Sequence, residues 1–438
     1  MNVDEVLDYA VVRRLQAEVA DLMTATKQAR DLAGERPLTD ADERQMALSV
    51  IQRAVSRYMQ AQIGQGRELP DGSVDLRLVI AVDAAIYGAG ELQELLDDDQ
   101  VENIDINGAD EVFVTYADER GKMRGRPVAA SDEDLIDIVQ NLASYAGLNA
   151  RPFTRAHPEL DLRLHDGSRL SACMSASERP IVSIRRNRFP QMFLPTLVEL
   201  GSIDEQLATF LSAAVRARAN IVVAGSTDAG KTTMLRALIN CIDPNERLIT
   251  VERAIELGLR RHPDLHPDVV ELEEVLPDAD GNGGITIGQL VRRTRRHNPS
   301  RVIVGEVLGP EVVEMLSAMS QGNNGSLSTI HARSAEDVFQ KLATYAAQFE
   351  GLDFAVTHAL IAGSIDFVVF LAKNPLMAGR RCVTEVLEVS HHAEGAVARS
   401  RIFHPSPVDG RATRSAEIPL IRADALQAAG YLDSAGWA

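Results

Sequence analysis

The chain has 438 residues, of which 45% are hydrophobic and 25% charged, the profile of a globular protein with two or three domains. Its net charge of -18 opposes nonspecific binding to nucleic acid or to anionic lipid. No stretch approaches the roughly 18 uninterrupted apolar residues of a membrane span. The acidic N-terminus does not resemble a signal peptide, so we expect a cytoplasmic protein.

Three cysteines, Cys173, Cys241 and Cys382, are far apart in the sequence and form no CxxC pair. This spacing supports neither a zinc knuckle nor a disulfide framework. We predict that all three are reduced and structural.

Residues 1–75 are predicted to form a helical N-terminal extension. Apolar residues recur at helical spacing between residues 11 and 22, and a second amphipathic stretch covers residues 41–63. The turn signal Gly34-Glu35-Arg36-Pro37 separates the two stretches. We expect this extension to act as a helical adaptor or packing arm.

Residues 76–188 are predicted to form a smaller α/β domain. Residues 101–106 alternate between apolar and polar, stop at Asn107-Gly108 and resume as residues 111–116, the pattern of a β-hairpin. A helix is expected to start near Ser131, because three acidic residues and a helical apolar face follow it. Strand-like segments return between residues 160 and 186, and residues 189–201 have the character of a linker or hinge.

Residues 202–404 are predicted to form the largest domain. Apolar strands are expected at residues 220–224, 247–251, 301–304 and 326–330, with helices at residues 231–241 and 310–321. Strands that alternate with helices predict a mainly parallel sheet covered on both faces. Residues 383–389 and 396–403 are expected to pair and complete this domain. The C-terminal tail, residues 405–438, is compatible either with a docking segment or with disorder.

A phosphate-binding loop is predicted directly after the first of these strands. The segment fits G-x-x-x-x-G-K-[ST] with the residues Gly225, Ser226, Thr227, Asp228, Ala229, Gly230, Lys231 and Thr232, followed by Thr233. The glycines let backbone N–H groups point at phosphate oxygens, and the following helix adds the positive end of its dipole. Lys231 is expected to reach the β- and γ-phosphates of ATP, and the Thr232 hydroxyl to ligate Mg²⁺. Asp228 adds a carboxylate to a loop built for anions, so its side chain should point outward.

Two acids and a histidine end other predicted strands of the same sheet. Glu252 and Glu306 each follow a strand, and acids at the carboxyl ends of parallel strands lie beside the nucleotide in this architecture. Hydrolysis needs a group that orients the attacking water and positive charge that meets the transition state. A neutral His331 is able to hydrogen-bond the γ-phosphate or the water, although a purely structural histidine is compatible with the same position.

Four ordered segments resemble motifs of the secretion ATPase superfamily, which drives type II secretion, type IV secretion and type IV or Tad/Flp pili. Residues 224–233, 250–257, 301–307 and 325–332 look like its Walker A motif, acidic box, Walker B motif and His box. Residues 166–169 and 183–186 are similar to segments of the CpaF branch, which powers Tad pili. The resemblance covers about residues 90–390 and implies a RecA-like P-loop ATPase domain preceded by the smaller α/β domain.

The resemblance also implies a role for each motif. Glu306 would be the catalytic acid, Glu252 would help to hold Mg²⁺ or water, and His331 would sense the γ-phosphate. Three matching arginines of the smaller domain, Arg169, Arg185 and Arg186, would close over the phosphates, with residues 189–201 as the hinge. These proteins work as hexameric rings. The expected partners are therefore further copies of the chain, an inner-membrane platform protein and, indirectly, a pilin or secreted substrate, but not nucleic acid.

Two residues depart from the family's pattern. Arg253 stands where the acidic box usually carries a second acid, while Glu256 remains. Asp228 stands where small or amide residues are common. These departures leave open a nucleotide-binding scaffold with little turnover, and a DNA-transfer ATPase of the conjugation type is the other alternative. The zinc-binding tetracysteine of the type II branch is absent from the sequence, which argues against a type II exporter.

The basic cluster Arg292-Arg293-Thr294-Arg295-Arg296 has three interpretations: a solvated helix face, a contact with nucleotide or a neighbouring subunit, or DNA binding. Taken together, the sequence predicts an ATP-hydrolysing motor of a bacterial pilus-assembly or type II/IV-like secretion machine. Its expected location is the inner face of the cytoplasmic membrane. ATP binding is expected to clamp the smaller domain onto the P-loop domain, and hydrolysis to release it.

Overall fold

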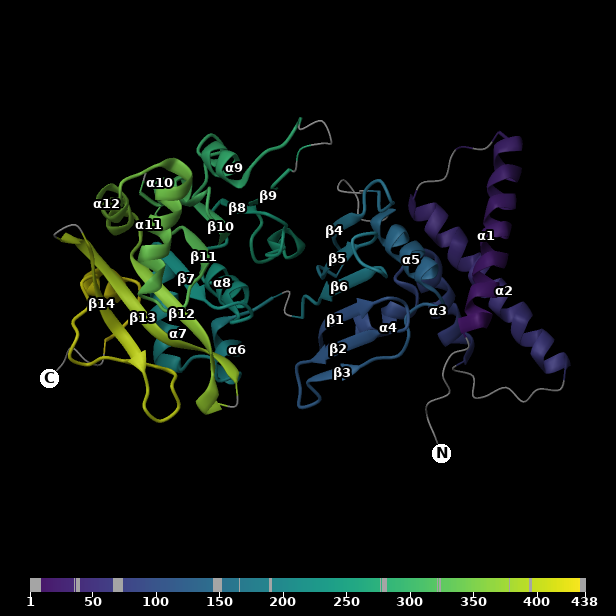
Figure 1. The fold of residues 1–438 in the computed structure, drawn as a ribbon, viewed down its shortest axis with the longest axis horizontal. Coiled ribbons are helices and arrows are strands. Elements are labelled where there is room, and N and C mark those ends of the chain that lie inside the picture. Colours follow the sequence, from purple (N-terminus) through teal and green to yellow (C-terminus); the bar gives the residue numbers. More distant parts are fainter. Residues whose placement is uncertain are drawn as a thin grey trace. The chain divides into compact units, whose positions relative to one another are not determined.

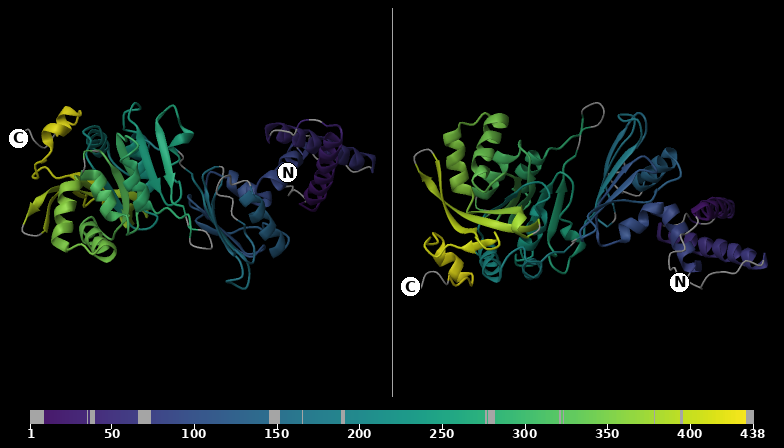
Figure 2. Two further views of the ribbon diagram at one scale, coloured as in Figure 1. Left: turned by 90° about the horizontal axis from the view of Figure 1, so that it is seen from above. Right: turned by 60° about the horizontal axis from the view of Figure 1, so that its bottom comes forward.

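The structure is a computed structural model of the chain. It describes residues 9–34, 36, 40–65, 74–144, 152–164, 166–188, 191–275, 277, 282–320, 322, 324–377, 379–393 and 396–433. The chain separates into two compact units, Met1–Arg188 and Phe189–Ala438 (Figures 1 and 2). Within the described residues, no helix is both long enough and apolar enough to cross a membrane.

Three helices open the first unit: α1 (Tyr9–Leu32), α2 (Asp40–Gly64) and α3 (Val74–Tyr87). Their apolar faces share one core, to which each helix contributes fully buried residues such as Leu15, Ile51 and Val82. The helical part of this unit therefore reaches Tyr87, beyond the boundary expected at residue 75. The reason is that α3 buries its own apolar face against α1 and α2.

An antiparallel sheet forms the rest of the first unit, with strand order β3-β2-β1-β6-β5-β4. Its strands are β1 (Val101–Asn107), β2 (Val112–Tyr116), β3 (Lys122–Arg124), β4 (Glu159–Arg163), β5 (Arg169–Cys173) and β6 (Ile181–Arg185). The predicted hairpin is confirmed, because Ile104 pairs with Val114. Three short helices accompany the sheet: η1 (Gly90–Leu92), α4 (Gln93–Asp97) and α5 (Asp132–Ser144). Leu92, Leu96 and Leu135 from these helices pack into the core that the sheet shares.

A second sheet forms the centre of the second unit, with strand order β15-β14-β13-β12-β7-β11-β10-β8-β9. Its strands are β7 (Ile221–Gly225), β8 (Leu248–Glu252), β9 (Val269–Glu273), β10 (Arg301–Val307), β11 (Leu327–His331), β12 (Phe367–Asn374), β13 (Arg380–Ala393), β14 (Ala396–Pro405) and β15 (Ala412–Arg414). The strands from β12 to β9 run parallel, and β13, β14 and β15 add an antiparallel edge. The predicted mainly parallel sheet is confirmed.

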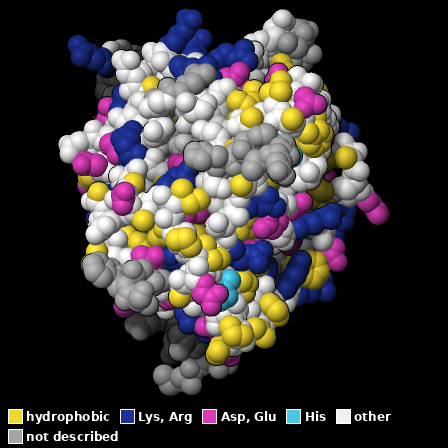
Figure 3. All heavy atoms as spheres, turned by 90° about the vertical axis from the view of Figure 1, so that its left-hand side faces the viewer, with side chains coloured by type: hydrophobic (Ala, Val, Ile, Leu, Met, Phe, Trp, Pro, Cys, Tyr) yellow, Lys and Arg dark blue, Asp and Glu magenta, His cyan; other side chains and the backbone are white. Residues whose placement is uncertain are grey.

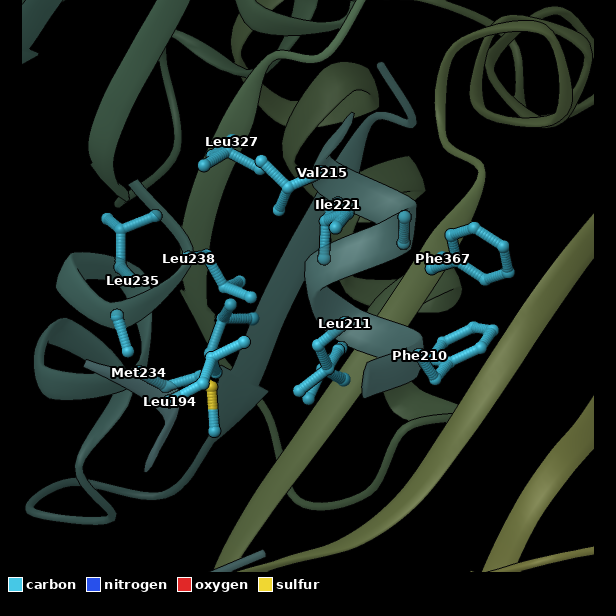
Figure 4. Packing of buried hydrophobic residues seen from close by; sticks show 14 of the residues in the cluster. Leu194, Phe210, Leu211, Val215, Ile221, Met234, Leu235, Leu238, Leu327 and Phe367 are labelled. Atoms are coloured by element: carbon cyan, nitrogen blue, oxygen red, sulfur yellow. The ribbon is translucent and has the colours of Figure 1, made fainter. Parts of the chain in front are cut away.

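Helices cover both faces of this sheet (Figure 1). The described helices of this unit are α6 (Leu194–Glu199), α7 (Glu205–Arg216), α8 (Lys231–Ile239), η3 (Leu259–Arg261), α9 (Ile287–Thr294), α10 (Val312–Ser320), α11 (Asp337–Glu350), α12 (Phe354–Ser364), η4 (Pro375–Met377) and α13 (Ala423–Ala428). Strand β7 is buried on both sides, since Ile221 belongs to one core and Val222 to the other. On the first of these faces, Phe210 and Leu211 of α7 pack against the sheet beside Phe367 (Figure 4).

The C-terminal segment, left open between docking and disorder, packs onto the second unit as far as it is described. Tyr431 belongs to the same core as Phe210, and their ring centroids are 5.4 Å apart. The carboxylate of Glu388, which is fully buried in β13, accepts hydrogen bonds from the backbone N–H groups of Ile421 and Arg422. These contacts make residues 412–431 part of the domain rather than a separate tail.

Candidate nucleotide-binding site

The phosphate loop joins the central strand β7 to helix α8. The backbone of this loop turns with positive φ angles of 61° at Asp228 and 92° at Gly230, and Gly230 is the N-cap of α8. Glycine adopts this left-handed region freely, and aspartate is one of the few other residues that tolerates it. The first turn of α8 therefore follows the loop directly, which is the arrangement of an anion-binding helix N-terminus.

Gly225 has no room for a side chain, because a Cβ there would lie 2.4 Å from the backbone oxygen of Leu371 in β12. We predict that Gly225→Ala lowers the free energy of unfolding by about 2 kcal/mol, the typical cost of overpacking against a fixed neighbour. Urea unfolding measures this loss. Gly363→Ala on α12 is the control, since nothing lies within 4 Å of its Cβ position. Equal losses in both variants would contradict the close packing of β12 behind the loop.

Three residues form a connected chain of contacts: Lys231 at the start of α8, His331 at the end of β11 and Glu306 near the end of β10. The buried Lys231 Nζ donates to the Ser226 carbonyl at 3.0 Å and lies 3.1 Å from His331 Nδ1. His331 Nε2 lies 2.7 Å from Glu306 Oε1. Because Nδ1 accepts from the ammonium group, the hydrogen-bond network assigns the proton of a neutral ring to Nε2, which donates to the carboxylate. The histidine thus links the cation of the loop to the acid of β10.

A β-bulge aims Glu306 toward this chain of contacts. Val304 pairs with Ser328 and Val307 with Ile330, so two residues of β10 lie opposite one residue of β11. The opposite residue, Thr329, donates from its hydroxyl to the Gly305 carbonyl at 2.7 Å. Bulges reorient side chains at the edges of functional sites. Here the bulge turns Glu306 out of the regular alternation and leaves its side chain 37% exposed.

Thr232 lies in the first turn of α8 and contacts an acid from the loop after β8. Its hydroxyl donates to Glu256 Oε2 at 3.1 Å, and Arg236 Nη2 donates to the Glu256 carbonyl at 2.6 Å. Of the other residues of the motif, Ser226 and Thr227 are exposed and Ala229 is buried. Thr233, also in the first turn, is half-buried. Glu256 is thus the acid that contacts the Thr232 hydroxyl.

Glu252 is placed differently from the expectation that it holds Mg²⁺. Its buried Oε2 accepts from the backbone N–H groups of Glu256 at 2.8 Å and Leu257 at 3.0 Å, while Oε1 has no hydrogen-bond partner among the described residues. Gly305 packs against this side chain, since a Cβ there would come 2.7 Å from Glu252 Cγ. Glu252 thus holds the loop that carries Glu256 toward Thr232.

The buried carboxyl of Glu252 makes stability depend on pH. Burial raises its pKa to about 7; the two backbone N–H groups lower it, and Glu256 and Glu271 raise it. The folded state therefore keeps a proton that the unfolded chain, with a pKa near 4.5, releases, so stability falls as pH rises from about 4.5 to 7. Glutamine does not titrate, so Glu252→Gln should escape this loss. In metal-free and nucleotide-free protein, its free energy of unfolding relative to that of wild type should rise by on the order of 3 kcal/mol between pH 5 and pH 8.

Urea unfolding of both proteins at the two pH values measures this gain. The exposed Glu350→Gln on α11 is the matched control and should keep a constant difference from wild type. A Glu252→Gln difference that is the same at pH 5 and pH 8 would contradict the raised pKa.

Asp228 lies in a cluster with two groups of opposite charge, which we call the loop-tip cluster (Asp228, Lys373 and Arg381). Arg381 donates from Nη2 to Asp228 Oδ1 at 2.8 Å and from Nε to the Asp228 carbonyl at 2.9 Å, and Lys373 Nζ lies 2.7 Å from Oδ2. Burial alone would raise the pKa of Asp228, but the hydrogen bonds from Lys373 and Arg381 outweigh it and lower that pKa. Sequence reasoning did not find the two cations.

In the first unit, Arg169 and Arg185 stand in a row of three arginines across the sheet. Arg163 of β4 is in register with Arg169 of β5, which is in register with Arg185 of β6. The neighbouring residue in each strand is buried in the core, so the row projects from the opposite face. Arg163 was missed, although alternation along β4 is a signal for it. Arg186 lies off this row, and its Nη1 pairs with Asp166 Oδ2 at 2.5 Å.

The basic cluster at residues 292–296 is partly neutralised. Arg292 and Arg295 both pair with Glu314 of α10, at 2.6 Å and 3.1 Å. Arg293 and Arg296 are exposed on the surface of the second unit. Two of the four arginines, Arg292 and Arg295, therefore belong to a salt-bridged helix face.

The sheet, its helices and the phosphate loop give the second unit the RecA-like P-loop ATPase fold, as the sequence predicted. The antiparallel sheet and N-terminal helices of the first unit complete the predicted fold class. A comparison with protein families then gives the assignment. The chain belongs to the type II/IV secretion system protein family, whose model matches residues 87–406.

Individual relatives agree with this family. The chain is 33% identical over 328 residues to the "Putative conjugal transfer protein Rv3659c" of Mycobacterium tuberculosis, covering 73% of this chain and 89% of that protein. It is 31% identical over 311 residues to Protein VirB11 of Agrobacterium fabrum, covering 63% and 86%. The solved pilus retraction motor PilT with bound ADP is similar in fold, with a TM-score of 0.50 and 16% identity over 70% of this chain and 84% of that one. The predicted membership of the secretion ATPase superfamily is confirmed.

Proposed function

We propose that this protein is the ATP-hydrolysing motor of a bacterial pilus-assembly or type II/IV-like secretion machine, closest to the CpaF-like Tad/Flp branch. The observation that supports this best is the contact chain from Lys231 through His331 to Glu306. It joins the cation that would meet the terminal phosphates to an acid that would orient the attacking water. A loop that only bound nucleotide would need neither this acid nor the bulge that aims it.

The site residues fit ATP and Mg²⁺ chemically. The backbone of residues 225–233 would cradle the phosphates, and Lys231 would pair with the β- and γ-phosphates. Thr232 would ligate Mg²⁺, with Glu256 close enough to hold a metal-bound water, because hydroxyl and carboxylate oxygens are the ligands that Mg²⁺ prefers. Bound Mg²⁺ would supply charge neutralisation at the phosphates. Glu252 would act through the loop that carries Glu256.

His331 and Glu306 would carry the hydrolytic step. Glu306 would orient a water and accept its proton, as a carboxylate within hydrogen-bond reach is able to do. The Nε2–H of His331 contacts Glu306. A γ-phosphate would compete for this donor and free the carboxylate for the water. The histidine would in this way report whether the terminal phosphate is present.

The arginine row of the first unit would close over the phosphates. Arg163, Arg169 and Arg185 are in register across three strands, and guanidinium groups are suited to bidentate contacts with phosphate oxygens. Arg186 would support them by fixing the turn at Asp166. Residues 189–201 would act as the hinge. Six copies would form a ring at the inner face of the cytoplasmic membrane, push an inner-membrane platform protein, and so move a pilin or secreted substrate.

A conjugation-type DNA-transfer ATPase is the second candidate, favoured by the name of the mycobacterial relative. The net charge of -18 speaks against direct DNA contact. On the face shown in Figure 3, Asp and Glu side chains lie among the Lys and Arg side chains. Such interspersed charge is unlike the continuous basic stripe that tracks a phosphate backbone.

Steady-state ATP hydrolysis by the purified chain, with and without single- and double-stranded DNA, tests the proposal. We expect hydrolysis that depends on Mg²⁺ and ignores DNA. Strong stimulation by DNA would replace the secretion motor by the DNA-transfer candidate. Tight ATP binding without turnover would instead identify a nucleotide-binding scaffold, in which Arg253 and Asp228 have removed the catalytic step.

A further inference from the structure

The carboxylate of Asp228 would repel the phosphates of a nucleotide bound at the loop. It sits within the loop whose backbone would receive three phosphates, and its left-handed φ of 61° suits aspartate sterically. An ionised carboxylate a few ångströms from a polyanion weakens binding on the order of tenfold or more, unless another charge neutralises it. The loop-tip cluster supplies that charge: two cations face one carboxylate, which leaves a net charge of +1.

The two cations come from one position of the hairpin formed by β12 and β13. Lys373 and Arg381 are cross-strand partners, so their side chains leave the same face of the hairpin. This hairpin is held close to the loop, because residues 367–371 of β12 pair with β7 and Arg381 Cδ lies 3.7 Å from the Cβ position of Gly230. Arg381 also donates to the Asp228 carbonyl, so it fixes the backbone as well as the carboxylate.

We propose that Arg381 and Lys373 are positioning residues of the nucleotide site. They neutralise Asp228 and hold the loop tip in its left-handed conformation, so that the loop accepts a nucleoside triphosphate in spite of its carboxylate. This inference rests on the proposed function, because it assumes that the loop binds ATP. It adds a requirement that the four sequence motifs do not contain, since both cations lie outside them.

ATP binding to the full chain, measured by titration calorimetry at low salt, tests the inference. Arg381→Gln keeps a hydrogen-bond donor but removes the charge, and should weaken ATP binding on the order of tenfold. Adding Asp228→Asn to that variant removes the carboxylate, which restores the net charge of +1 through Lys373, and asparagine tolerates the same φ, so affinity should return to within about twofold of wild type. Raising the salt to about 1 M should shrink the loss in the single variant, because the repulsion is screened.

Arg380→Gln is the matched control. It removes the same charge one residue earlier in β13, where the exposed side chain alternates to the opposite face. Its ATP affinity should equal that of wild type. If Arg381→Gln does not fold, as judged by thermal unfolding, Lys373→Gln with and without Asp228→Asn takes its place, with the same expected loss and rescue.

Unchanged ATP binding in Arg381→Gln would overturn the inference. So would a double variant as weak as the single one, because Arg381 would then contact the nucleotide itself or serve the fold alone. A folded wild-type chain that binds no ATP would overturn the proposed function, and this inference with it. The wild-type titration alone distinguishes that failure from the other two.

Discussion

Replacing Lys231 with alanine is expected to reduce ATP affinity on the order of 100-fold or more. The substitution removes the only cation that the phosphate loop itself contributes and breaks the contacts with the Ser226 carbonyl and His331 Nδ1. A lysine at this position meets the β- and γ-phosphates, and hydrogen bonds to charged groups are among the strongest in proteins. Titration calorimetry with ATP and Mg²⁺ measures the loss directly.

Lys341→Ala is the control for this experiment. Lys341 lies on α11, where its ammonium stacks 5.6 Å from the ring centroid of Tyr345. It carries the same charge outside the site, so its removal should leave ATP affinity unchanged. Equal affinities of Lys231→Ala and wild type would mean that the predicted phosphate loop does not bind nucleotide.

The second large effect is expected in Glu306→Gln, which should bind ATP but lose turnover by a factor on the order of 100 to 10,000, the typical contribution of a general base. Glutamine keeps the size of the side chain and an acceptor for His331 Nε2, but it cannot take a proton from water. Binding should persist because Lys231 and the loop backbone remain. Steady-state hydrolysis and ATP titration on the same preparation separate the two quantities.

Glu385→Gln provides a matched control on β13, where the acid pairs with Arg401. It removes one carboxylate from the same sheet without touching the loop, so the turnover number should stay at the wild-type value. Normal turnover in Glu306→Gln would exclude Glu306 as the catalytic acid. Loss of ATP binding in that variant would show instead that the substitution disturbs the loop through His331.

Much of the fold follows from local patterns in the sequence. The hairpin around Asn107-Gly108 was predictable because alternation and a turn signal coincide there, and the structure pairs those strands. Strands β7, β8, β10 and β11 of the second unit were predictable because each is a short apolar run, whereas the parallel strands β9 and β12 were not predicted. Helix α3 was assigned to the wrong side of a boundary, since only its packing on α1 and α2 shows where the helical part ends.

In the candidate site, local sequence patterns predicted which residues lie near the nucleotide but not the directions of all their side chains. Strand ends located Lys231, His331 and Glu306 near one edge of the sheet, and the structure brings their side chains into contact. The direction in which a strand-end acid points depends on its neighbours, which the sequence alone does not give. The absence of a side chain at Gly305 lets Glu252 turn into the interior, so that Glu256 meets Thr232 instead.

The loop-tip cluster could not have been predicted by the same means. Residues 367–372 form an apolar run without a helical or alternating period that distinguishes strand from helix. Only the pairing of β12 with β7 brings Lys373 and Arg381 to the phosphate loop. Charge complementarity across such a distance in sequence becomes visible once the strand order is known.

The central position of β7 has a consequence for how the protein is made. The neighbours of this strand, β11 and β12, follow it much later in the chain, and the contacts that complete the loop span 100 residues to His331 and 153 residues to Arg381. Synthesis proceeds from the N-terminus at roughly 5–20 residues per second. The ribosome must therefore release most of the chain before β7 has either partner. During that interval the nascent chain carries a fully apolar, unpaired strand beside an incomplete loop, which is the kind of segment that chaperones shield.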